Sequence, residues 1–198
     1  MGRIKTDNNH TRKEVIITNA AVLFKEKGFK AASMRELAEV VGVEAASLYN
    51  HILSKSELLH IICFEVANRY MQTMDDIENE KKTSIKKVEK LLRFLITGMV
   101  LHYDEVYVSD REWKHLSEPY LSNFQTQRRT FRKRFAAIID QGIKKKEIKK
   151  IDAATAVLIL LHAISGIESW HRSKVKINGK ELEENMITIL VGGLKYKA

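Results

Sequence analysis

Residues 33–59, SMRELAEVVGVEAASLYNHILSKSELL, constrain the fold of this chain more than any other stretch. They open with Ser33-x-x-Glu36, a capping box in which two side chains satisfy backbone N–H groups at the start of a helix. Apolar residues at helical spacing follow. Gly42 is typical of a helix end, because glycine adopts the left-handed conformation at little steric cost. We therefore predict a short helix between Ser33 and Gly42.

A second short helix is predicted from Ala46 to Ile52, with Leu48 on its buried side. Ser54-x-x-Glu57 is another capping box and predicts that the next helix starts there. Two helices joined by a tight turn with glycine form a helix-turn-helix, whose second helix enters the major groove of DNA. The stretch thus predicts a DNA-binding head.

The order of three segments in this stretch resembles the N-terminal signature of TetR-family transcriptional repressors. The segments are Gly42-Val43, Leu48-Tyr49-Asn50-His51-Ile52 and Ser54-Lys55-Ser56-Glu57-Leu58. The resemblance covers roughly residues 11 to 60. Two positions depart from the family pattern: Glu44 replaces a small polar residue, and Ile52 replaces phenylalanine. Glu44 is a poor N-cap for the second helix and brings negative charge towards DNA phosphates.

The composition favours an all-helical protein, with one proline and nine glycines among 198 residues. This length allows one domain or two small ones with a substantial core. A net charge of +9 suits an anionic partner such as nucleic acid, an acidic membrane or a phosphorylated ligand. A basic surface without such a partner gives the same charge, so the motif and not the charge identifies DNA.

Cysteine usage and hydropathy indicate a protein of the cytoplasm. The single cysteine, Cys63, excludes an internal disulfide, and its neighbours Ile61, Ile62 and Phe64 predict a buried structural thiol. No stretch approaches ~18 uninterrupted apolar residues, and the polar N-terminus lacks the apolar region of a signal peptide. We expect a soluble, cytoplasmic protein with no membrane partner and no cofactor.

Periodicity and helix-breaking residues divide the chain into about nine helices. Their expected ranges are 11–27, 34–41, 46–52, 54–76, 84–103, 109–118, 119–141, 152–172 and 180–194. We expect a three-helix DNA-binding head at 1–56 and a larger helical body for ligand binding and dimerisation at 57–198. In TetR relatives the last two long helices pair across a two-fold axis, which implies pairing here through 153–171 and 180–194. Deep burial within a monomer would give a similar apolar pattern.

The resemblance implies a homodimer that reads a palindromic operator with one head per half-site. By their positions in the motif, Tyr49, His51 and Lys55 resemble family residues that hold phosphates, which set register rather than sequence. Packing of Tyr49 inside the head is an equally weighted alternative. Ser33 can donate to a phosphate from a helix N-terminus, and Arg35 lies within reach of DNA.

Base recognition is expected from Ser47 and Asn50, because an asparagine amide can bond an adenine edge with two hydrogen bonds. Ala45 and Ala46 offer only apolar contact, for example to thymine methyl groups. With few groups able to read bases, specificity is expected to lean also on DNA shape.

Two further segments loosely resemble the C-terminal domains of acyl-CoA-responsive TetR relatives. They are Asp110-Arg111-Glu112-Trp113 and Glu168-Ser169-Trp170-His171-Arg172. The resemblance implies an apolar tunnel for an acyl chain and basic residues for the CoA phosphates, whose geometry suits guanidinium groups. Candidate ligand-binding residues are Trp113, Arg128, Arg129, Arg132, Trp170 and Arg172. For any single arginine a solvated surface ion pair is the commoner role, and for either tryptophan a place in the core.

Two other functions remain open from the sequence. Glu112-x-x-His115 and Glu168-x-x-His171 have the spacing of carboxylate-bridged di-iron bundles, with Glu65 and Glu89 as further ligands, although Pro119 ends the first helix too early for a mid-bundle site. A DNA-binding protein without a small-molecule effector is the other alternative. The chain shows no phosphate-binding glycine loop, zinc-ligand spacing or nucleophile elbow. We therefore predict a repressor and not an enzyme, with the helix from Ser54 linking the ligand-binding body to the head.

Overall fold

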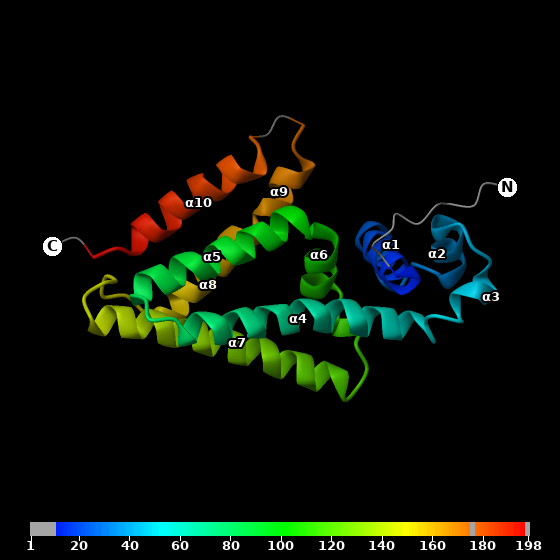
Figure 1. Ribbon diagram of the computed structural model, residues 1–198, viewed down its shortest axis with the longest axis horizontal. Helices are drawn as coiled ribbons and strands as arrows, with labels where there is room; N and C mark the ends of the chain where they lie inside the picture. Colours follow the sequence, from blue (N-terminus) through cyan, green and yellow to red (C-terminus); the bar gives the residue numbers. More distant parts are fainter. Residues whose placement is uncertain (1–10, 175–176, 197–198) are drawn as a thin grey trace. The chain divides into compact units, whose positions relative to one another are not determined.

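The computed structural model describes residues 11–174 and 177–196 (Figure 1). These described residues form ten α-helices and one 3-10 turn and contain no strand, apart from an isolated bridge between Ile148 and Lys195. The predicted all-helical class is confirmed. The helices are α1 (Arg12–Lys27), α2 (Met34–Val41), α3 (Ala45–Leu48), α4 (Lys55–Asn79), α5 (Ser84–Leu101), α6 (Tyr103–Arg111), α7 (Tyr120–Lys144), α8 (Ala153–Ser165), α9 (Ile167–Arg172) and α10 (Gly179–Leu194), with the 3-10 turn η1 at Trp113–His115.

The chain packs as two compact units, and two helices contribute to both. Unit 1 comprises Met1–Ala67 and Asp104–Gln125, and unit 2 comprises Asn68–Tyr103 and Thr126–Ala198. By packing, therefore, the head does not end at residue 56: it continues into α4 and includes α6, η1 and the start of α7. The division into a DNA-binding part and a ligand-binding part at 56/57 remains a functional proposal.

Local capping signals set the first two helices of unit 1. Thr11 and Glu14 form a capping box at the start of α1, and Ser33 and Glu36 form the predicted one at the start of α2. Gly42 ends α2 in the left-handed conformation, with φ 73° and ψ 38°. The inner face of α1 is buried and comprises Ile16, Ala20, Leu23 and Phe24.

The recognition helix α3 is shorter than predicted. Only Ala45–Leu48 is α-helical, and Glu44 makes no side-chain capping bond. The chain then continues as tight turns, in which the N–H of Asn50 bonds Ser47 O at 3.3 Å and the N–H of His51 bonds Leu48 O at 3.0 Å. An uncapped N-terminus leaves the first N–H groups of a helix without side-chain partners. The short α3 is therefore held mainly by burial of Leu48.

The core of unit 1 joins the helix-turn-helix to segments from the middle of the chain. Leu48, Leu59 and Cys63 are fully buried, and Val108 and Phe124 belong to the same apolar cluster. The predicted burial of the Cys63 thiol is confirmed. Residues beyond 104 thus complete the head, because α1–α3 and the start of α4 alone leave one side of this cluster uncovered.

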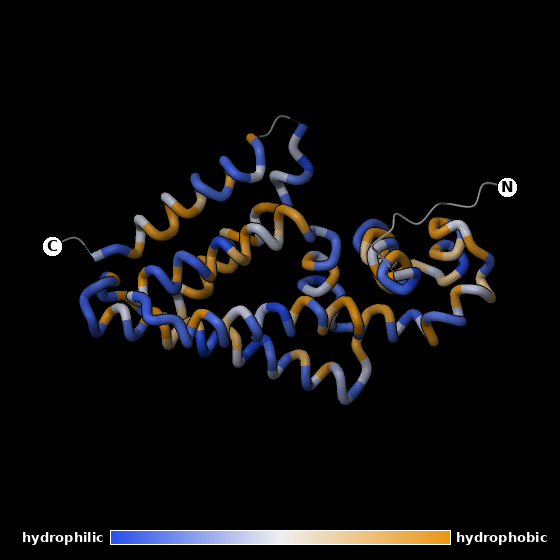
Figure 2. Tube along the Cα trace, in the orientation of Figure 1, coloured by the Kyte–Doolittle hydropathy of each residue, from blue (hydrophilic) through white to orange (hydrophobic). Residues whose placement is uncertain are grey.

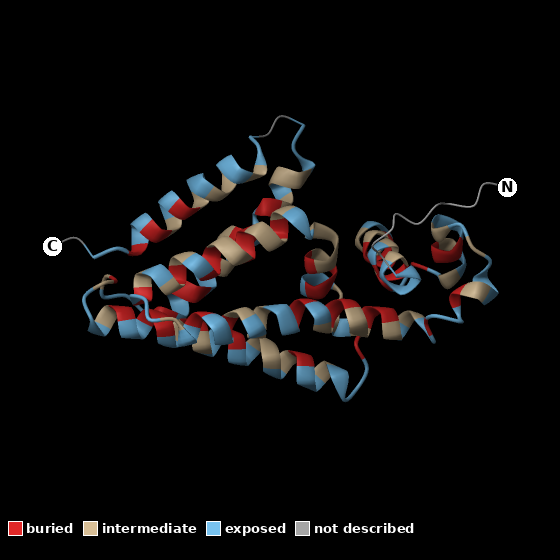
Figure 3. Ribbon diagram, in the orientation of Figure 1, coloured by how far each residue is buried: buried red, intermediate tan, exposed pale blue. Residues whose placement is uncertain are grey.

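Unit 2 is organised around α5, which packs against α8, α9 and α10. An apolar stripe of α5 is buried, including Val88, Leu91, Leu92, Leu95 and Ile96 (Figure 3). The second half of α4 joins this unit through Tyr70, whose ring centroid lies 5.5 Å from that of Phe131 on α7.

Three predicted boundaries were wrong. The helix predicted at 109–118 is instead α6 and η1, since α6 begins at Tyr103 directly after α5. The helix α7 runs past Gly142 to Lys144. Gly142 lies inside the helix instead of ending it, and its lack of a side chain makes room for Ile148, since a Cβ atom there would meet Ile148 Cδ1 at 2.6 Å. The single helix predicted at 152–172 is divided at Gly166 into α8 and α9.

Candidate nucleic-acid interface

The recognition turn presents polar side chains on a buried anchor. Leu48 is fully buried, whereas Tyr49, Asn50 and His51 are exposed and Ser47 is half-buried. Tyr49 is 50% exposed, so it is not packed inside the head as a core residue. The side chains predicted to read or hold DNA therefore lie together on one short segment, with their positions set by one core residue.

The two alanines at the start of α3 are exposed as well. Ala45 and Ala46 lie on the solvent side, and Glu44 precedes them with an exposed side chain. Their methyl groups can make only apolar contacts, as predicted from the sequence. The polar groups able to read a base are thus confined to the end of α3 and the turn that follows.

The hydroxyl of Ser33 caps α2, so a phosphate contact by Ser33 would form beside its capping hydrogen bonds. Its hydroxyl accepts a hydrogen bond from Glu36 N at 3.2 Å and donates to Glu36 Oε2 at 2.8 Å. Lys27 Nζ lies 2.5 Å from the other carboxylate oxygen of Glu36. The hydrogen bond from Lys27, followed by those from Ser33, lowers the pKa of Glu36 to about 2. Glu36 is therefore charged at neutral pH and holds the Ser33 hydroxyl on the helix cap.

Arg35 is the freer of the two candidates on α2. Its side chain is exposed, and its Nε lies 3.3 Å from Glu39 Oε1, one helical turn away. A solvated pair of this kind contributes little to stability, so it leaves the guanidinium available to another anion. The predicted approach of Arg35 to DNA remains a prediction.

Lys55 uses its ammonium within unit 1. Its Nζ donates to the carbonyls of Phe29 at 2.8 Å, Lys30 at 3.2 Å and Ala32 at 2.8 Å. The same Nζ lies 4.6 Å from the centroid of the Phe29 ring. A lysine ammonium has three N–H donors, and all three have partners here. The phosphate contact implied by the family motif would thus compete with a structural role in the α1–α2 turn.

One exposed apolar residue beside the recognition turn was not predicted from the sequence. Leu53 is 82% exposed, next to the buried Ile52, and its N–H donates to Glu57 Oε2 at 2.6 Å. Of the predicted second capping box only one bond forms: Glu57 N donates to Ser54 Oγ at 3.1 Å, while the Glu57 carboxylate accepts from Leu53 N instead of Ser54 N. The adjacent apolar residues Ile52 and Leu53 could have indicated this exposed side chain from the sequence, because the turn buries only one of the two.

The candidate ligand-binding residues are distributed over both units. Trp113 belongs to unit 1, where it packs against the core 6.2 Å from the Phe124 ring. The others lie in unit 2: Arg128, Arg129 and Arg132 on α7, and Trp170 and Arg172 on α9.

Two of these residues are engaged locally. Trp170 Nε1 donates to Ile177 O at 2.9 Å, and Arg172 lies 2.7 Å from Glu168. Arg129 is exposed and bonds only its helical neighbour Thr126 among the contacts described. These contacts leave ligand binding by the set as a prediction.

The two Glu-x-x-His motifs serve other purposes than metal binding. Glu112 Oε2 accepts the Phe29 N–H at 3.0 Å, and His115 stacks on the Phe29 ring. In the second motif, Glu168 pairs with Arg172, and His171 Nε2 donates to Met99 O at 2.8 Å. Among the described residues there is no group of three or more His, Cys, Asp or Glu side chains placed to hold a metal ion.

Comparisons with known proteins agree with this arrangement. Residues 16–62 match the family model described as bacterial regulatory proteins, tetR family, and residues 81–194 match the tetracyclin repressor-like C-terminal domain. The HTH-type transcriptional repressor KstR2 of Mycobacterium tuberculosis (strain H37Rv) is 21% identical over 196 residues, covering 98% of each chain. The negative regulator IcaR of the biofilm operon icaADBC in Staphylococcus aureus (strain Newman) is 26% identical over 162 residues, covering 80% of this chain and 82% of IcaR.

Solved structures share the fold. The ketosteroid transcriptional regulator KstR2 of Mycobacterium tuberculosis superimposes with a TM-score of 0.87 at 20% identity, covering 98% of this chain and 100% of the other. AibR in complex with isovaleryl coenzyme A and operator DNA superimposes with a TM-score of 0.79 at 18% identity, covering 91% of this chain and 98% of the other.

Proposed function

Because this chain belongs to the TetR family of bacterial regulatory proteins, we propose that it is a repressor whose homodimer binds a palindromic operator and is released by a small molecule. It is a transcriptional regulator and not an enzyme, as predicted. The observation that supports the proposal most strongly is the polar set of exposed Tyr49, Asn50 and His51 and half-buried Ser47, anchored by buried Leu48. A regulator that reads operator DNA works in the cytoplasm, where we place this protein.

In this proposal the exposed residues divide the work on DNA. Asn50 and Ser47 read base edges, and Tyr49 and His51 hold phosphates. Ala45 and Ala46 make apolar contacts beside them. At the edge of the interface, charge or hydrogen bonds come from Arg35, Ser33 and Lys55. In the free chain these three side chains already contact other groups of the protein.

Dimerisation through α8 and α10 is supported by their exposed apolar residues. Leu158 and Ile159 on α8 are 57% and 59% exposed, and Ile189 on α10 is 71% exposed. Apolar residues recur along α10 and continue onto its exposed positions (Figures 2 and 3). Large exposed apolar side chains in neighbouring positions are typical of protein interfaces.

The stretch Ala153–Arg172 gives a second reason to expect a partner at this surface. It is long and apolar enough to cross a membrane by length and composition alone, and only 33% of its most apolar window is buried within the chain. In a protein that binds DNA, an exposed apolar stretch of this kind is more simply covered by a second copy of the chain. A homodimer provides that cover and also supplies two heads for a palindrome.

The small molecule that would release the repressor has a proposed chemical class. We propose an acyl-CoA bound in unit 2, with Arg128, Arg129 and Arg132 near the phosphates and Trp170 and Arg172 as further contacts. The support is the loose resemblance of two segments to acyl-CoA-responsive relatives and the shared fold with AibR, which was crystallised with isovaleryl coenzyme A. A repressor without an effector is the second candidate, because Trp170 and Arg172 are engaged by local partners.

The test has two stages. Duplexes selected from a random library by the purified protein should contain a palindrome, and sedimentation should show one or more dimers per duplex. A thermal-shift panel of acyl-CoAs, free fatty acids, drugs and dyes then identifies an effector, because a ligand of the native state raises the melting midpoint by mass action. Selection of no sequence would contradict the repressor. Operator binding without any thermal shift would favour the candidate without an effector.

A further inference from the structure

The turn between α1 and α2 is held by a segment from far along the chain. The N–H of Phe29 donates to Glu112 Oε2 at 3.0 Å, across 83 positions of sequence. The ring of Phe29 stacks on His115, with centroids 5.6 Å apart and planes 19° from parallel. Both contacts come from Glu112–His115, at the 3-10 turn η1. One short segment therefore grips both the backbone and the side chain of a single turn residue.

A second tie joins the same two regions. Lys25, in the last turns of α1, lies 2.5 Å from the carboxylate of Asp104 at the start of α6. Leu116, directly after η1, is buried in the core of unit 1. Residues 104–116 thus meet the end of α1 at one end through an ion pair and at the other through Glu112. We call residues 104–116 the contact segment.

The turn that Glu112 holds leads directly into the helix-turn-helix. Ala32 N donates to Gly28 O at 3.1 Å, which closes the turn around Phe29. Ser33, the next residue, is the N-cap of α2. A shift of Glu112 would release a partly buried N–H group, and such a group needs a partner away from water. The Glu112–Phe29 hydrogen bond therefore connects the contact segment to the turn that ends at the N-cap of α2.

We propose that Glu112 is a positioning residue for DNA recognition, which couples the state of the contact segment to the orientation of α2. The carboxylate touches neither DNA nor effector in this role: it acts by holding the Phe29 N–H. The inference rests on the proposed function, since it gives that function a route from the middle of the chain to the head. What matters is the reach of an acceptor oxygen to Phe29 N, because the hydrogen bond needs that distance.

Two conservative substitutions separate the effect of the length of the Glu112 side chain from the effect of its charge. Glu112→Gln keeps an acceptor oxygen at the same distance and removes the charge. Glu112→Asp keeps the charge and shortens the side chain by one methylene group, which withdraws the oxygen from Phe29 N. Glu112→Ala removes both. Lys114→Ala is the matched control, because Lys114 is exposed on the same turn and has no hydrogen bond or ion pair with the described residues.

The readout is hydrogen exchange of the contact segment with and without DNA, using the full chain and the duplex selected by the wild type. In the wild type, and in the variants Glu112→Gln and Lys114→Ala, duplex binding should change the rate of hydrogen exchange in residues 104–116. In Glu112→Asp and Glu112→Ala that change should be lost. Their affinity for the duplex should fall on the order of ten-fold, within the usual range of coupling between sites. A residue with only a structural role would alter melting but leave the DNA-induced change in place.

Several outcomes would overturn the inference. One is an unchanged DNA response in Glu112→Asp, and another is a loss of response in Glu112→Gln equal to that in Glu112→Asp. Absence of any response in the wild-type contact segment would also contradict it, while leaving DNA binding intact. If Glu112→Ala fails to fold, the comparison of Gln with Asp still decides. A wild type that selects no duplex would instead contradict the proposed function itself.

Discussion

The ammonium of Lys55 lies 4.6 Å from the centroid of the Phe29 ring and donates a 2.8 Å hydrogen bond to the carbonyl of the same residue. Lys55 begins α4, and Phe29 lies in the turn before α2. Lys55, which the family motif places on a phosphate, therefore also holds the start of α4 against the turn before α2.

Replacing Lys55 tests this second role. We expect Lys55→Ala to lower the free energy of unfolding by about 1.5–3 kcal/mol, the usual range for hydrogen bonds to a charged group. Urea denaturation of the free protein measures the change. Lys30→Ala is the control, because only the backbone carbonyl of Lys30 bonds Lys55. Equal stability of the two variants would show that the three carbonyls are satisfied by water instead.

The phosphate contact of Lys55 is tested separately by salt. If Lys55 also neutralises a phosphate, the slope of log affinity against log salt should flatten by about one unit in Lys55→Ala, uniformly across duplex sequences. Titrations at several salt concentrations with the selected duplex and a scrambled one give the slope. A changed base preference at one position would instead assign Lys55 to base readout.

Glu44 is the weakest local choice in the head. It is the N-cap of α3, makes no side-chain capping bond and stands where the second helix should meet DNA. Glu44→Ser should stabilise the free protein by about 0.5–1 kcal/mol through a new cap and tighten DNA binding by removing a negative charge. Glu44→Ala is the control, because it removes the charge without adding a cap. Equal stability of the Ser and Ala variants would mean that the cap does not form.

Asn50 tests the assignment of base readout. We expect Asn50→Ala to lose about 1–3 kcal/mol of discrimination at one base pair in each half-site, with adenine as the expected base. Repeating the library selection with the variant shows which position relaxes. Because the Asn50 side chain is exposed, the melting midpoint should stay unchanged. A uniform loss of affinity with intact sequence preference would place Asn50 on the DNA backbone.

Signals that act within four residues made the head predictable from sequence. The capping box of Ser33 and Glu36, the glycine at the end of α2 and the inner face of α1 all depend on side chains one helical turn apart. The family motif added the residue types on the recognition turn. The exposure of Asn50 and the burial of Leu48 follow from the same short-range pattern.

Contacts between distant residues account for what the sequence could not predict. Gly142 reads as a helix end, but Ile148 packs on it from beyond the helix and the helix continues. Glu112 reads as half of a Glu-x-x-His motif, yet its partner is a backbone N–H 83 positions away. No spacing rule connects such pairs, because the partner is a backbone group that every residue carries.

His60 gives the head a pH dependence. Its ring lies 4.0 Å from the ring of Tyr120 and 4.6 Å from that of Phe64, and burial lowers the pKa of His60 below its ordinary value of 6.5. The charge of Glu57 opposes this shift more weakly. The unfolded chain then binds more protons than the folded one between the two pKa values. Stability should be fully present above pH 6.5 and be lost as pH falls through the folded pKa.

Melting midpoints from pH 7.5 to 5 check this prediction for His60. His60→Phe should retain more of its stability on acidification than the wild type, since it removes the titrating ring and keeps the aromatic packing. His51→Gln, at an exposed position on the recognition turn, should follow the wild-type profile. Identical profiles for wild type and His60→Phe would assign the acid sensitivity to other groups.

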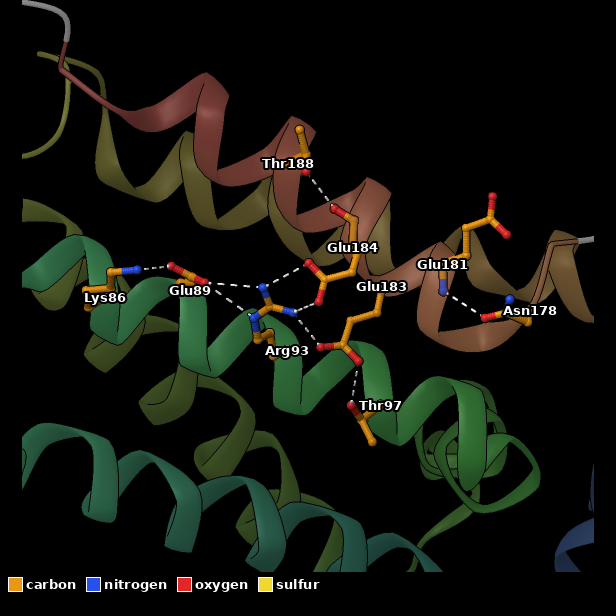
Figure 4. Close-up of polar contacts among 9 residues, drawn as sticks. All are labelled: Lys86, Glu89, Arg93, Thr97, Asn178, Glu181, Glu183, Glu184 and Thr188. Carbon is orange, nitrogen blue, oxygen red and sulfur yellow. Dashed lines mark hydrogen bonds and ion pairs between the residues drawn. The ribbon is translucent and has the colours of Figure 1, made fainter.

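Arg93 fastens α10 to α5 through carboxylates on both helices (Figure 4). Its guanidinium lies 2.9 Å from Glu183, 2.7 Å from Glu184 and 3.3 Å from Glu89. The hydrogen bonds that Arg93 donates to Glu184 and Glu183 raise the pKa of Arg93, so it stays charged at any accessible pH. The first half of α10 depends on this contact, because its buried apolar residues begin only at Ile187.

Arg93→Ala should therefore loosen the first half of α10 and weaken the dimer that we propose, without unfolding unit 2. Arg93→Lys should not restore the dimer, because one ammonium lacks the planar fork that reaches several carboxylates. Lys86→Ala is the control, since Lys86 pairs with Glu89 within α5 alone, at 2.9 Å. Sedimentation over a concentration series measures dimer dissociation, and hydrogen exchange measures α10. A dimer of wild-type strength in Arg93→Ala, with faster exchange in α10, would place the two-fold contact on α8 alone.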